Sequence, residues 1–80
     1  MDEPDQRDFA HWHRLASENL LATTTAAFTD HAMAVMLAGC AAVYGRRAQA
    51  EASNEFEKLL ASDVTRSAGR MADLLEDHDG

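Results

Sequence analysis

Two histidines flank the single tryptophan near the start of the chain, and they are the first candidates for chemistry. His11 and His13 are one residue apart, which at first sight suggests a metal-binding pair. On a helix, however, residues two apart point about 200° apart, whereas helical metal ligands share a face at i and i+3 or i+4. Asp8 and His11 have that spacing, but two ligands are too few for a site. We therefore expect solvated histidines, a packing role for Trp12 and no metal site.

Asp30 and His31 form the titratable pair that lies closest to the apolar middle of the chain. Such a pair can cap a helix, fix helix register or make a hydrogen bond between subunits. Cys40 lies on the opposite side of a straight helix from His31, so the two cannot act together as nucleophile and base. A free cysteine in an apolar run is usually a small buried side chain.

The motifs that carry most enzyme chemistry are absent from the sequence. It contains no glycine-rich phosphate loop, no Gly-x-Ser-x-Gly, no His-Glu-x-x-His and no Cys-x-x-Cys. One cysteine also cannot form an intrachain disulfide or supply the thiolates of a structural zinc site. The sequence therefore predicts no catalytic residue, no cofactor and no enzymatic activity.

The charge is strongly acidic and is concentrated at the two ends of the chain. Fourteen acidic residues stand against seven basic ones, for a formal charge of −7. Nucleic-acid binding needs clustered Lys and Arg, but the only adjacent basic pair is Arg46-Arg47, so we expect no nucleic-acid partner. The acidic start, with Pro4, does not resemble a signal peptide, and we expect a cytoplasmic protein.

Helix is favoured almost throughout, because Pro4 is the only proline. After an acidic N-terminal cap over residues 1–8, with Pro4 in a first helical turn, we expect an apolar helix over residues 9–45. Its apolar stripe recurs every three or four residues. The members of this stripe are Phe9, Trp12, Ala16, Leu20, Thr23, Ala27 and His31.

Residues 32–44 contain no charge and are apolar around the whole helix circumference. This run is shorter than the roughly 18–20 apolar residues that span a bilayer, so we expect no membrane span. We expect it instead to be covered by other helices on nearly every side. Small side chains there would let a neighbouring helix approach closely. They are Ala34, Ala38, Ala41, Ala42 and Gly45.

A second amphipathic helix is expected over residues 54–76. Asn54, followed three positions later by Glu57, resembles a capping box. Residues 45–53 can either turn or continue as helix, with Gly45 as an internal glycine and Ser53-Asn54 as the better boundary. We expect the acidic tail, residues 77–80, to fray.

The predicted fold is all-α: long amphipathic helices that form a helical hairpin or coiled-coil bundle completed by self-association. The chain has 80 residues, and 16 of its apolar residues are alanine, so its own core is thin. The interface is expected to use the larger residues of both stripes. These are Trp12, Leu20, His31, Val35, Met36, Val43, Phe56, Leu60, Met71 and Leu75.

The chain also resembles phasins, the alanine-rich, proline-poor helical proteins that coat bacterial polyhydroxyalkanoate granules. The resemblance covers roughly residues 15–62 and lies in their composition and helical texture. It is carried by Leu20-Leu21-Ala22, Ala32-Met33-Ala34-Val35-Met36, Gly45-Arg46-Arg47-Ala48-Gln49-Ala50-Glu51 and Phe56-Glu57-Lys58-Leu59-Leu60-Ala61. It implies a coat or scaffold on a hydrophobic granule surface and no catalytic residues.

An alternative function is a small acidic helical adaptor that binds a larger protein through residues 31–44. The two hypotheses differ in what they expect of a bare hydrophobic particle. A coat binds it in proportion to apolar area, whereas an adaptor ignores it and forms a defined complex.

Overall fold

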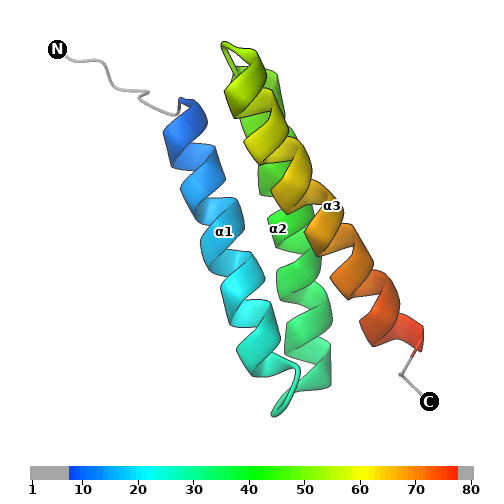
Figure 1. Ribbon diagram of the computed structural model, residues 1–80. Coiled ribbons are helices and arrows are strands. Elements are labelled where there is room, and N and C mark those ends of the chain that lie inside the picture. The colour runs from blue at the N-terminus through cyan, green and yellow to red at the C-terminus, as the bar shows by residue number, and fades with distance from the viewer. Residues whose placement is uncertain (1–7, 78–80) are drawn as a thin grey trace, which may run out of the picture.

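The computed structural model describes residues 8–77 and consists of three helices (Figure 1). Helix α1 spans Phe9–Ala26, α2 spans His31–Glu51 and α3 spans Glu55–Asp77. No strand occurs between residues 8 and 77, and the helices pack against one another. The all-α prediction is therefore confirmed.

Helix α1 begins at an aspartate cap. The Asp8 backbone is extended, and its Oδ1 accepts a hydrogen bond from the His11 amide at 3.1 Å. This satisfies one of the amide groups that a helix start leaves without a partner. Asp8 and His11 are thus joined by a capping bond. The earlier start proposed at Pro4, with the rest of the acidic segment 1–7, lies outside the described residues.

The single apolar helix expected over residues 9–45 is wrong, because the chain turns at residues 27–29. The amide groups of Thr29 and Asp30 both donate to the Ala26 carbonyl and close this turn. Asp30 then caps α2, since its Oδ1 accepts from the Met33 amide at 3.1 Å. A cap was one of the roles that the sequence left open for Asp30.

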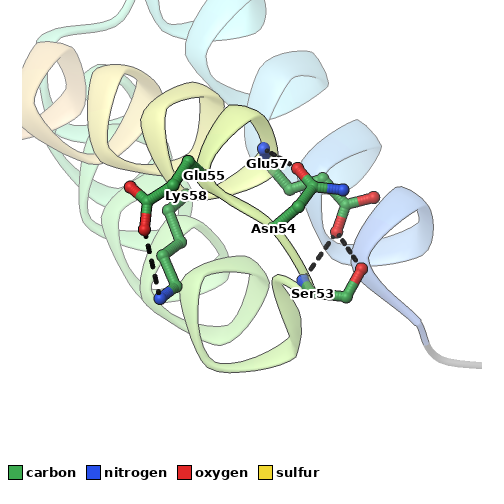
Figure 2. Close-up of polar contacts among 5 residues, drawn as sticks. All are labelled: Ser53, Asn54, Glu55, Glu57 and Lys58. Atoms are coloured by element: carbon green, nitrogen blue, oxygen red, sulfur yellow. Dashed lines mark hydrogen bonds and ion pairs between the residues drawn. The ribbon is translucent and has the colours of Figure 1, made fainter.

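The second boundary falls where Ser53 and Asn54 indicated. Gly45 is internal to α2, which continues to Glu51, and α3 runs without a break to Asp77. Figure 2 shows the cap: the Asn54 side chain accepts from the Glu57 amide at 2.8 Å, and the Glu57 carboxylate accepts from the Ser53 amide at 2.8 Å. The Glu57 carboxylate therefore reaches one residue further back than in the usual capping box.

Helix α2 is the centre of the fold. In Figure 1 the chain runs down, up and down again, so α1 and α3 are each antiparallel to α2. Both pack mainly against α2 and contact one another much less. The molecule measures 48 × 27 × 14 Å along its principal axes. It is therefore a thin slab, and one side of α2 remains uncovered.

Alanine fills the core. The buried stripe of α2 follows the 3-4 spacing of a coiled coil and faces α1 and α3. Its members are Ala34, Ala38, Ala41, Gly45 and Ala48. The sequence predicted that small side chains on this segment let a neighbouring helix approach closely. This prediction is confirmed for Ala34, Ala38, Ala41 and Gly45, which are buried. Ala42, which it also named, is half-buried. Among the residues that the structure describes, Thr23 is the largest side chain that is fully buried.

Two apolar clusters lie within this core. One joins Ala26, Ala34, Ala38 and Leu75 near the α1–α2 turn, and the other joins Trp12, Ala48 and Ala61 near the α2–α3 turn. Each buried alanine contributes little, since burial of one methyl-sized group stabilises by about 0.8 kcal/mol. The larger members therefore supply a disproportionate share of the packing energy.

Candidate interaction surface

Many of the large apolar side chains are exposed on the surface of the molecule. Among those in residues 8–77, only Trp12, Val64 and Leu75 are buried. Eight are exposed, and they come from all three helices and the first turn. They are Leu21, Phe28, Met33, Met36, Val43, Phe56, Leu59 and Leu74. Where such side chains adjoin on one face, they mark a candidate interaction site.

The most regular part of this surface is the side of α2 turned away from its alanine stripe. We call it the outer α2 face; it consists of Met33, Met36, Cys40 and Val43, which are spaced three, four and three residues apart. Met36 is 58% exposed and Val43 is 49% exposed. A shallow apolar depression beside them is lined by Met36, Gly39, Cys40, Val43 and Tyr44. Coverage of the 32–44 run on nearly every side is therefore wrong for the single chain.

Gly39 deepens this depression. Apart from the helix's own nearby backbone, no heavy atom lies within 4 Å of the point where a Cβ would stand at Gly39, so the missing side chain leaves open space. The backbone of α2 is thus accessible to a partner at the middle of the outer α2 face.

An aromatic cluster closes one end of the slab and holds α1 to α2. The Trp12 and Tyr44 rings stack with centroids 5.8 Å apart, and the Arg47 guanidinium lies 4.6 Å from the Trp12 ring centroid. Offset ring pairs and cation–π contacts each contribute about 0.5–1.5 kcal/mol beyond area burial. Trp12 therefore packs within the chain, as the sequence indicated.

The two histidines beside Trp12 also take part in ring contacts. The His11 ring meets the Trp12 ring edge-on at 4.9 Å, and the His13 ring stacks on Phe9 at 5.3 Å. Within residues 8–77, no group of three or more His, Cys, Asp or Glu side chains gathers to hold a metal ion. The described residues thus assign packing contacts to both histidines.

The residues expected at the interface divide into three groups by burial. Trp12 and Leu75 are buried within the chain's own core, and Val35 and Met71 pack against it. Leu20, His31 and Leu60 are half-buried. Met36, Val43 and Phe56 are exposed. Of these expected interface residues, only Met36 and Val43 are therefore exposed together on one face of one helix.

Several apolar residues that are exposed or half-buried were not among the predicted interface positions. Met33 and Cys40 complete the outer α2 face, and their spacing from Met36 and Val43 was a signal in the sequence. Phe28 could not be placed in this way, because it lies in the turn at residues 27–29, where the sequence predicted a continuous helix.

None of the described helices is both long enough and apolar enough to cross a membrane. Comparisons with protein-family models, curated proteins and solved structures gave no match to this chain. Its function is therefore inferred from the exposed apolar side chains and their arrangement.

Proposed function

We propose that this protein is a non-enzymatic, self-associating helical protein that coats a hydrophobic surface, in the way that phasins coat polymer granules. One observation carries the proposal: alanines occupy the core while eight large apolar side chains are exposed. A chain that acted alone would gain stability from the opposite arrangement. The exposed side chains therefore have a use outside the folded chain.

The shape of the molecule supports this proposal. A slab 14 Å thick can place a large part of its surface against a flat support. Transfer of apolar area out of water is worth about 25 cal/mol per Å², and it makes few demands on the geometry of the other surface. Met33 and Met36 suit an irregular support, because their thioether side chains are flexible.

The charge distribution fits a coat in the cytoplasm. Acidic residues are concentrated at the two ends of the chain, and the formal net charge is −7. If the helices lie on a particle, these charges remain in water and keep coated particles apart by like-charge repulsion.

A second candidate function is an adaptor that binds one protein partner through residues 31–44. The observation that favours it is the depression on α2, which is local and is lined by Met36, Cys40 and Val43 among others. A groove of this kind suits an apolar helix of a partner. It leaves unexplained the exposed Leu21 and Phe28, which lie outside this segment.

Adsorption to particles separates the two functions. The protein would be mixed with polyhydroxyalkanoate beads, polystyrene beads and hydrophilic silica of equal area, while circular dichroism follows helix content. The coat hypothesis predicts saturable adsorption to both kinds of apolar bead, with helix content retained and little dependence on salt. It predicts no adsorption to silica. Failure to adsorb to either apolar bead would reject the coat and favour the adaptor.

A further inference from the structure

The outer α2 face has a spacing that reads the same in both directions. Its residues follow the a-d-a-d pattern of a coiled coil: Met33 and Cys40 occupy a positions, and Met36 and Val43 occupy d positions. Reversing the helix about residue 38 exchanges Met33 with Val43 and Met36 with Cys40. Each a position thereby meets a d position, as antiparallel pairing of two helices requires.

The charges at the two ends of α2 distinguish the antiparallel from the parallel arrangement. Asp30 caps the N-terminal end and is exposed, and Arg46 and Arg47 stand exposed near the C-terminal end. No ion pair within residues 8–77 involves either arginine. Antiparallel pairing brings the Asp30 end of one α2 beside the Arg46-Arg47 end of the other at both ends of the pair, whereas parallel pairing sets the two arginine ends beside each other.

We infer that the outer α2 face is the site at which two copies of this chain pair, antiparallel and about a twofold axis near residue 38. The inference rests on the self-association in the proposed function and names its partner and direction. An interface of this kind is self-complementary, as a twofold dimer requires. Gly39, which has open space beside it, lies close to the axis and lets the two backbones approach.

The apolar side chains supply most of the affinity of this dimer and the charges set its direction. Met33 to Val43 covers only about 15 Å of helix, so the dimer dissociates on dilution. Attraction between the exposed opposite charges at each end of the pair contributes about 0–1 kcal/mol. Juxtaposed like charges cost a similar amount, and the difference is enough to select the antiparallel dimer.

Disulfide trapping tests the register directly. One chain carries Met36→Cys with Cys40→Ser, and the other is the wild type with its native Cys40. Antiparallel pairing sets the introduced thiol at position 36 of the first chain opposite Cys40 of the second. We expect oxidation of the mixture to give a covalent heterodimer several-fold faster than oxidation of either chain alone. Faster homodimer formation by each chain alone would show parallel pairing and overturn the inference.

Sedimentation equilibrium provides an independent measurement. For the wild type we expect a dimer that dissociates on dilution. Met36→Asp should associate at least tenfold more weakly, because it places a charge in the interface. Its helix content should not change, because Met36 is exposed and lies outside the core. The matched control is Leu21→Asp, an exposed apolar residue of α1, which should leave the dimer intact. A wild type that stays monomeric, or a Met36→Asp variant that dimerises normally, would overturn the inference.

These outcomes differ from those that test the coat. A chain that adsorbs to apolar beads but gives no mixed disulfide keeps its proposed coating function and loses this pairing. A chain that gives the mixed disulfide but ignores beads keeps the pairing and loses the coat.

Discussion

Gly45 of α2 and Thr65 of α3 lie so close that a methyl group at position 45 would overlap the Thr65 hydroxyl. The point where that Cβ would stand is also only 3.2 Å from the Thr65 Cα, so rotation of the threonine side chain could move the hydroxyl but would not relieve the contact with the α3 backbone. The hydroxyl itself donates to the Ala61 carbonyl at 2.7 Å. The separation of α2 and α3 therefore depends on the absence of a side chain at Gly45.

This relationship predicts that Gly45→Ala destabilises the fold. Overpacking costs about 1–3 kcal/mol, against a helix-propensity gain of up to about 1 kcal/mol for alanine over glycine. We expect a net loss of about 1 kcal/mol in the free energy of unfolding, measured by urea denaturation at fixed protein concentration.

Gly69 provides the matched control for this substitution. It lies within α3, and no heavy atom comes within 4 Å of its Cβ position. Gly69→Ala should therefore raise stability by about 0.5–1 kcal/mol through helix propensity alone. Equal effects at positions 45 and 69 would contradict the close approach of α2 to α3.

Trp12 is the largest side chain of the core and is expected to dominate its stability. Replacement of a buried tryptophan by alanine costs about 3–5 kcal/mol, which equals most of what a core in a chain of this size supplies. We expect Trp12→Ala to lose most of its helix content at 25 °C by circular dichroism. The control is Leu21→Ala at an exposed position, where the change should stay within about 0.5 kcal/mol. A fully folded Trp12→Ala would show that the aromatic cluster is dispensable.

Much of the fold could be predicted from the sequence, because small residues and caps act locally. The stripe from Ala34 to Gly45 and the boundary at Asn54 were both found from spacing and residue type alone. The turn at residues 27–29 was missed, since the apolar stripe continues in phase through Ala27 to His31 and no glycine or proline interrupts it. Asp30 was the signal, but an aspartate is compatible with both a cap and a helix surface.

The candidate surface was harder to predict than the fold. A helix that is apolar on all sides does not reveal which side its neighbours cover. On α2 the neighbours cover the alanines, which allow the closest approach, and leave Met36 and Val43 exposed. Both Leu75 and Met36 were expected at the interface, because spacing and residue type do not separate Leu75, which is buried in the chain's own core, from Met36, which is exposed.

The cap at the start of α3 should be sensitive to a single substitution. Asn54 accepts the Glu57 amide, and loss of such a cap costs about 0.5–2 kcal/mol. We expect Asn54→Ala to lower the urea midpoint accordingly and Asn54→Asp, which keeps an acceptor oxygen, to retain most of the stability. Lys58 and Glu55, whose charged atoms lie 3.8 Å apart on the exposed surface, should matter little, so Lys58→Ala serves as a neighbouring control.

The coating function makes a prediction about Phe28 and Leu59, whose side chains are 88% and 66% exposed. Burial of one such side chain is worth about 1.5–3 kcal/mol, so Phe28→Ser or Leu59→Ser should weaken adsorption to polyhydroxyalkanoate beads roughly tenfold or more where that residue contacts the bead. Stability in urea should change by no more than about 0.5 kcal/mol, because neither side chain belongs to the core. Gln49→Ser, at an exposed polar position of α2, is the control and should adsorb as the wild type does. If Phe28→Ser, Leu59→Ser and the control all adsorb equally, neither of the two apolar side chains contacts the bead, and the coat loses its physical basis at α3 and the first turn.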